Sequence, residues 1–143
     1  MSESRCSRSK PFLIAGIVLA GLLPWVVVLY DGGGYAVNAL GWLDVGSWHA
    51  VSLPTYYVTY ARGSLPRSLS AWPVASLLWV AALGSVALAD RRVTAGLLVL
   101  GGVDVFWFAL GLGGQQGITA FPIGSIVLFV AALGTWWLAV TGR

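Results

Sequence analysis

The sequence contains very few charged residues. Charged side chains make up 9% of its 143 residues and hydrophobic ones 58%, whereas soluble domains carry about 25% charged residues. This deficit argues against a soluble globule and predicts an integral membrane protein located in the cell membrane. A chain of this length is expected to form one domain, residues 1–143.

Cysteine and histidine each occur once. Cys6 cannot form an internal disulfide, and no second cysteine or histidine lies nearby to complete a zinc site. It is interpreted as an incidental residue of the polar N-terminal tail, with a reversible acyl anchor as the alternative. No other motif indicates a bound group, so we expect no metal and no cofactor.

Four apolar segments are long enough to cross a bilayer, whose core needs about 20 mostly apolar residues per helix. They cover residues 12–30, 71–89, 93–112 and 121–140. Pro24 lies well inside the first segment and is expected to kink it and to free the carbonyl of Ala20. The sequence therefore predicts an all-α membrane protein, a bundle of four transmembrane helices.

The basic residues flank these segments and form no basic face of the kind that binds nucleic acid. We therefore expect no nucleic-acid partner. With the N-terminus inside, six basic residues fall on the inner side and two on the outer: Arg5, Arg8, Lys10, Arg91, Arg92 and Arg143 against Arg62 and Arg67. Because basic residues are enriched in cytoplasmic loops, this bias predicts that both termini are cytoplasmic.

The first two segments are separated by a long outer segment, residues 31–70. The five tyrosines of the chain lie in it or at its edge, and tyrosine favours the membrane–water interface. Pro54 at a first helical position and Gly63 just beyond a last turn are typical of a short helix, with Tyr56 and Tyr60 on one face. We expect one or two short interfacial helices, with an aromatic ligand-binding lid as the alternative.

The same outer segment contains a second group of polar residues. His49 lies a few residues after Asp44, which can orient it, and together with Tyr56 and Tyr60 they form a candidate outer interfacial site. A lone histidine is more often an interfacial hydrogen-bonding group than a ligand. No serine or cysteine has the sequence context of a nucleophile, so we expect no catalytic residues.

One acid, Asp104, lies inside an apolar run. It is about 18 Å beyond Arg92 at about 1.5 Å per helical residue, close to the midplane of a core about 30 Å thick. Depth matching places Trp25, Ser76 and Trp79 beside it, and either indole N–H can donate to the acid. Since no basic residue lies at that depth, we predict a largely protonated carboxyl group.

Two interpretations of Asp104 stay open. In the first, it forms an interhelical hydrogen bond that fixes helix register. In the second, it is a proton or cation site, which is the usual suspicion for an acid inside a membrane. Proton relays normally use several ionisable groups, and only one is present here, which favours the first interpretation.

A stretch of 32 residues resembles a known family. The run WHAVSLPTYYVTYARGSLPRSLSAWPVASLLW, residues 48–79, is similar to part of a family of small, uncharacterised membrane proteins of haloarchaea, and the pair Pro24–Trp25 fits the same family. Seven arginines to one lysine agree with it. The resemblance covers about a quarter of the chain. It implies four membrane spans and a salt-loving archaeal host, and no activity.

These observations favour a non-enzymatic structural or accessory component of a membrane assembly. Small residues spaced by four, such as Gly16 with Ala20 and Ala131 with Thr135, let helices pack closely in lipid. Partners are then membrane lipid and either a second copy of the chain or other membrane subunits. The alternative is a small proton- or cation-coupled carrier or channel centred on Asp104, and a membrane enzyme is the third reading.

Overall fold

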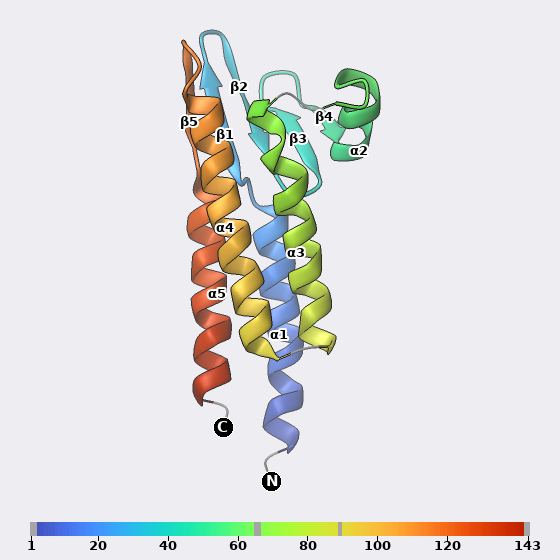
Figure 1. Cartoon of the computed structure of the whole chain (residues 1–143), viewed down its shortest axis with the longest axis vertical. Coiled ribbons are helices and arrows are strands. Elements are labelled where there is room, and N and C mark those ends of the chain that lie inside the picture. Colours follow the sequence, from blue (N-terminus) through green and yellow to red (C-terminus); the bar gives the residue numbers. More distant parts are fainter. Residues whose placement is uncertain (1–2, 65–66, 89, 142–143) are drawn as a thin grey trace.

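The computed structural model describes residues 3–64, 67–88 and 90–141 and, apart from Ser68, the side chains from Lys10 onward. Four long helices run side by side, and a five-stranded antiparallel sheet covers one end of them (Figure 1). The long helices are α1 (Glu3–Leu22), α3 (Ala71–Leu88), α4 (Arg91–Gly113) and α5 (Ile123–Thr141). The strands are β1 (Val26–Tyr30), β2 (Gly33–Val37), β3 (Gly41–Asp44), β4 (His49–Ser52) and β5 (Ile118–Phe121).

The predicted all-α fold is therefore wrong, and the protein is a mixed α/β structure. The error begins in the first apolar segment, residues 12–30. Helix α1 ends at Leu22, and Pro24 terminates it instead of kinking it because proline cannot continue the hydrogen-bond ladder. Three consecutive valines, Val26 to Val28, then favour a strand. The apolar run was long enough for a span, but it contains two elements.

Three described helices, α3, α4 and α5, are long and apolar enough to cross a membrane. They correspond to the predicted spans at 71–89, 93–112 and 121–140, and residue 89 lies outside the described residues. The apolar part of α1, Lys10–Leu22, is shorter than the other three. Cys6 lies in α1, and its side chain is outside the described part.

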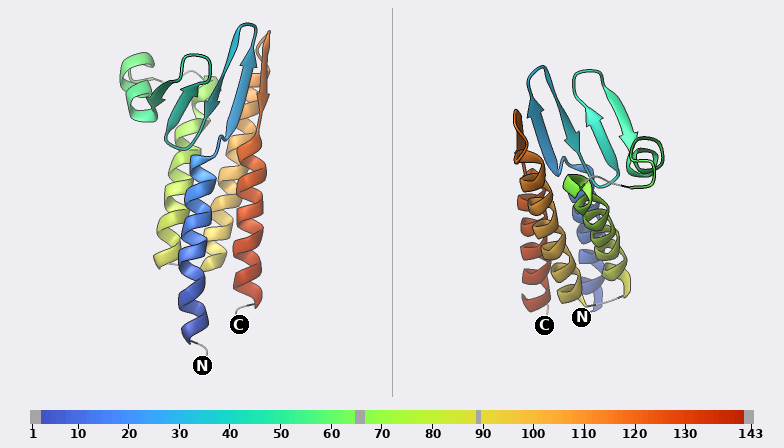
Figure 2. Two further views of the ribbon diagram at one scale, coloured as in Figure 1. Left: turned by 180° about the vertical axis from the view of Figure 1, so that it is seen from behind. Right: turned by 45° about the horizontal axis from the view of Figure 1, so that its top comes forward.

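The sheet has the strand order β4-β3-β2-β1-β5. Strands β1 to β4 form a meander, and Figure 2 shows this sheet seated across the helix ends. The fifth strand comes from the connection between α4 and α5, where no strand was expected. It pairs with β1 through Val27 opposite Phe121 and Tyr30 opposite Ile118.

The outer segment, residues 31–70, was expected to hold one or two short helices, and it contains three of the strands in addition to short helical turns. Short helical turns follow: α2 (Leu53–Thr55), the π-helical η1 (Tyr56–Tyr60) and the 3₁₀ turn η2 (Arg67–Leu69). Ser52 caps α2 by accepting a hydrogen bond from the backbone N–H of Thr55. The turn after η1 uses left-handed backbone at Gly63, with φ of +84°, a conformation that glycine adopts without strain.

The buried core runs from the sheet into the bundle. Its largest fully buried side chains include Trp25, Trp72, Phe108, Leu98 and Leu128. The outward faces of α3, α4 and α5 carry large, exposed apolar residues, among them Leu77 (69% exposed), Trp107 (71%), Leu133 (68%) and Trp137 (66%). Such an extensive apolar exterior suits helices surrounded by lipid.

The junction between α1 and the sheet satisfies the backbone groups that Pro24 leaves free. The indole Nε1 of Trp25 donates to the carbonyl of Ala20 at 2.8 Å, the carbonyl that the proline deprives of its helical partner. The backbone N–H of Ala39 donates to Gly21 at 3.1 Å. The carbonyl freed by the proline thus finds its donor in the very next residue.

Candidate functional site

A pocket of about 200 Å³ lies between the sheet and the start of α3. Its lining is mostly aromatic and comes from the five elements β2, β3, η1, η2 and α3: Tyr35, Val37, Trp42, Tyr56, Leu69 and Trp72. Of these residues, only Tyr56 was a predicted site residue. We describe this pocket as the aromatic pocket.

Two strands supply one wall of the aromatic pocket. In the antiparallel pairing of β2 with β3, Val37 lies opposite Trp42 and Tyr35 opposite Asp44. Residues two apart on a strand share a face, as do directly opposed residues, so these four side chains project from the same side of the sheet. The rings of Tyr35 and Trp42 meet edge to face, with centroids 5.9 Å apart.

Helical residues supply the other wall. The ring of Tyr56 lies 5.8 Å from Trp72 and stacks on Tyr60 at 5.6 Å, so the predicted shared face of Tyr56 and Tyr60 is present. Trp72 is fixed at both ends, since its Nε1 donates to the carbonyl of Asn38 at 2.9 Å and its ring stacks on Phe108. The pocket walls are therefore rigid on the α3 side.

Two polar groups face this aromatic environment. Burial raises the pKa of Tyr35 above its ordinary value of 10.0, and Tyr56 and Tyr30 raise it further, so its hydroxyl stays neutral and able to donate. The indole Nε1 of Trp42 is buried and has no hydrogen-bond partner among the described residues. The pocket thus offers aromatic stacking surfaces, with the hydroxyl group of Tyr35 on one of its lining residues.

The other residues of the predicted outer site lie at the rim of the sheet. His49 is opposite Asp44 in the pairing of β3 with β4, and its ring packs edge-on against Trp42 at 6.4 Å. In the described part of the chain, the carboxylate of Asp44 accepts hydrogen bonds from the backbone N–H groups of Gly46 and Ser47 instead of from His49. The bond from Gly46 is the main cause that lowers the pKa of Asp44 below 3.8. Asp44 therefore stabilises its own turn.

In the predicted intramembrane site, Trp25, Ser76 and Trp79 donate to backbone carbonyls and not to Asp104. The indole of Trp25 donates to Ala20, and that of Trp79 donates to the carbonyl of Ile17 at 2.7 Å. Ser76 donates to the carbonyl of Ala39 at 2.7 Å. The expected indole hydrogen bond to Asp104 is therefore wrong, because backbone carbonyls at the end of α1 and in the β2–β3 connection take these donors.

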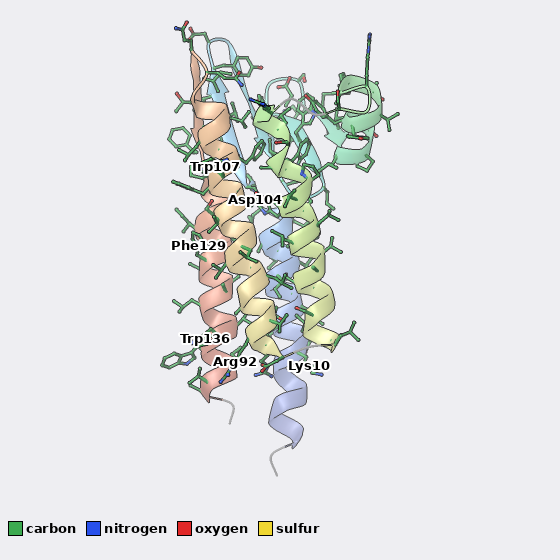
Figure 3. The ribbon with its side chains drawn as sticks, viewed as in Figure 1. Lys10, Arg92, Asp104, Trp107, Phe129 and Trp136 are labelled. Atoms are coloured by element: carbon green, nitrogen blue, oxygen red, sulfur yellow. The ribbon has the colours of Figure 1, made fainter. Side chains whose placement is uncertain are left out.

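Asp104 lies in the half of the bundle nearer the sheet (Figure 3). Its carboxyl group lies against the backbone of Ala75 on α3, and Phe108, one turn further along α4, stacks on Trp72. Its Oδ2 is buried with no hydrogen-bond partner among the described residues. Asp104 is thus a neighbour of the aromatic pocket's wall and lies outside its lining.

A sequence signal for the aromatic pocket existed. Tyr35 with Val37, and Trp42 with Asp44, lie at alternate positions and share the period of two that indicates a strand. The segment was nevertheless expected to form only short helices. Nothing in the sequence predicted that Trp72 lines a pocket, because a tryptophan at a helix start is equally expected at a membrane interface.

The protein belongs to a family described as a domain of unknown function (DUF8050), whose match covers residues 1–143. No curated protein matches the chain. The family is uncharacterised, as the resemblance implied, and the haloarchaeal host stays a prediction.

Proposed function

We propose that this protein is a non-enzymatic integral membrane protein, a structural or accessory component of a membrane assembly that displays its sheet on the outer side. The observation that carries the proposal is the division of the molecule into two parts. One is a bundle with an apolar exterior. The other is a sheet with short helical turns, and it contains the five tyrosines of the chain.

In this proposal α3, α4 and α5 cross the bilayer, and α1 packs against them through its shorter apolar part. The end that holds the start of α1 and the end of α5 faces the cytoplasm. Lys10 and Arg92 lie at that end (Figure 3), and Arg67 precedes α3 at the sheet end. The bias of basic residues toward the first end supports this orientation.

The sheet end also carries the surface we propose for a partner. Trp48 is 77% exposed and Val58 72% exposed, and large apolar side chains outside a membrane commonly mark protein contacts. If the host is salt-loving, as the resemblance implies, exposed charges are screened within about 3 Å at molar salt. A partner would then be held by apolar contacts of this kind.

The test is a pull-down from gently solubilised membranes at native expression, after a carbonate wash that removes peripheral proteins. We expect the chain to stay in the membrane and to retain a second subunit or a second copy of itself. The double variant Trp48→Ser with Val58→Ser should lose that partner, whereas Trp107→Leu, on the bundle exterior, should keep it. Release by carbonate, or recovery of monomer alone, contradicts the proposal.

One observation favours a second candidate function, a proton- or cation-coupled carrier. It is the buried, unpartnered Oδ2 of Asp104. Vesicles containing wild-type protein should then dissipate a pH gradient faster than vesicles containing Asp104→Asn. Equal leak from two equally folded proteins removes the carrier hypothesis and leaves Asp104 as a packing residue.

A further inference from the structure

A groove of about 620 Å³ runs between α4 and α5 on the outer face of the bundle. Small residues form its floor: Ala95 and Ala132 are almost fully buried, and Gly96 presents no side chain. Val99, Leu133 and Phe129 rise beside them. The groove is apolar along its length and open to the surroundings of the bundle.

One residue in the lining of this groove is charged. Arg92, in the first turn of α4, lies at the end away from the sheet, and its guanidinium carbon is 5.7 Å from the centre of the Trp136 ring (Figure 3). Among the described residues, the guanidinium group has no hydrogen bond or ion pair besides this contact with the ring. Its neighbour Arg91 instead donates to the carbonyl of Leu138 at 3.1 Å. The apolar groove therefore ends at Arg92, whose guanidinium N–H groups form no hydrogen bond with the described residues.

We infer that the groove between α4 and α5 binds an anionic phospholipid, with one acyl chain along the small-residue floor and the phosphate on Arg92. The inference rests on the proposed membrane insertion. A guanidinium group binds a phosphate through two short, parallel hydrogen bonds, so the contact persists even where salt screens longer-range attraction. Trp136 suits the same position, because its ring holds the cation and favours the interface.

A second groove on α5 provides a comparison within the same molecule. It lies between α1 and α5, has a volume of about 540 Å³ and is lined by residues that include Gly16, Val130, Gly134 and Leu138. Among the described side chains, which exclude those before Lys10, no charged residue lines it. It can hold an acyl chain, and nothing in its lining selects a headgroup.

The experiment measures lipid retention by native mass spectrometry of the full chain, with phosphatidylglycerol and phosphatidylcholine as probes. Arg92→Gln removes the charge, and Lys10→Gln removes a charge at the same end of the bundle but outside the groove. Gly96→Leu fills the groove, and Gly134→Leu fills the second one. An added Cβ meets nothing within 4 Å at either glycine, so both leucines should be accommodated.

Wild-type protein should retain phosphatidylglycerol in preference to phosphatidylcholine by about fivefold, the ratio expected for one basic residue at a membrane surface. Arg92→Gln should abolish the preference, Gly96→Leu should reduce retention of both lipids, and Lys10→Gln and Gly134→Leu should leave the preference unchanged. A preference that survives Arg92→Gln, a retention that Gly96→Leu leaves unchanged, or a preference that is lost equally in the two controls overturns the inference.

A carbonate wash of the same variants separates this inference from the proposed function. A chain that leaves the membrane contradicts both. A chain that stays in the membrane and shows no lipid preference contradicts the lipid site alone.

Discussion

The two ends of the bundle hold α1 in different ways. On the sheet side, the indole of Trp79 donates to the carbonyl of Ile17, and its ring packs directly onto Gly21. At the opposite end α1 borders the second groove, and Phe12 is 79% exposed. There the polar contacts connect other helices, with Ser85 against Thr94 and Arg91 on Leu138.

This difference shows where the bundle tolerates change. Close helix packing in lipid depends on small residues that let backbones and large rings approach. On the sheet side Gly21 leaves room for the indole ring of Trp79. Toward the other end, a Cβ added at Gly16, Gly96 or Gly134 would meet nothing within 4 Å. The same residue type is therefore essential at one end and replaceable at the other.

The largest effect should come from Gly21→Ala. A Cβ at this position overlaps the ring of Trp79, so the ring must move and its hydrogen bond to Ile17 is lost. Overpacking of this kind costs about 2–3 kcal/mol, measured as the free energy of unfolding in detergent. Gly16→Ala, on the same helix with nothing within 4 Å, is the matched control and should be neutral or slightly stabilising. Equal losses in the two variants would show that α1 is held alike at both ends.

Trp79→Phe should have the next largest effect. The ring is retained in part, but the hydrogen bond from Nε1 to the carbonyl of Ile17 is removed, which costs about 1–2 kcal/mol. Trp107→Phe, at a residue 71% exposed on the bundle exterior, should change the unfolding free energy little. A loss in Trp107→Phe as large as that in Trp79→Phe would contradict the assigned role of the indole.

At the far end, Ser85→Ala should cost less. The hydroxyl of Ser85 donates to the carbonyl of Ala82 at 2.8 Å, so in the 2.7 Å contact with Thr94 it is Thr94 that donates. Removing such a side-chain hydrogen bond between membrane helices costs about 0.6 kcal/mol on average. A double-mutant cycle with Thr94→Val measures the coupling, and additive losses would mean that the two hydroxyls do not interact.

The smallest effect should come from the turn after β3. Asp44 has a lowered pKa because the N–H groups of Gly46 and Ser47 bind its charged form. The stabilisation is therefore complete above the unfolded pKa and is lost as the pH falls through the lower folded value. The amide resonance of Gly46 should titrate with a midpoint below 3.8 in NMR spectra, and Asp44→Asn should remove this titration. A midpoint at or above 3.8 would contradict the hydrogen bonds.

The helices α3, α4 and α5 could be predicted from the sequence because each is a long apolar run without an internal break. At the start of α4, the side chain of Asp90 caps the helix by accepting from the N–H of Arg92. The prediction of one helix over residues 12–30 was wrong because length alone does not distinguish one helix from a helix followed by a valine-rich strand. Pro24 was recognised, but a proline inside an apolar run can kink a helix or end it.

The sites were harder to predict for a similar reason. Depth along the helices places Asp104, Ser76 and the tryptophans at one level. It does not show which acceptor each indole or hydroxyl donor binds. Carbonyls at the end of α1 and at Ala39 take those donors in the structure. The aromatic pocket depends on strand register, which brings Tyr35 and Trp42 together across a turn and which requires the strands to be known first.

The position of β5 has a consequence for biogenesis. One edge of β1 is complete only when residues 118–121 arrive beside it, long after β1 to β4 have left the ribosome. Until α4 has formed and the chain turns back, that edge exposes unpaired backbone groups. A chain truncated after α4 would therefore leave this edge of β1 unpaired and open to mispairing.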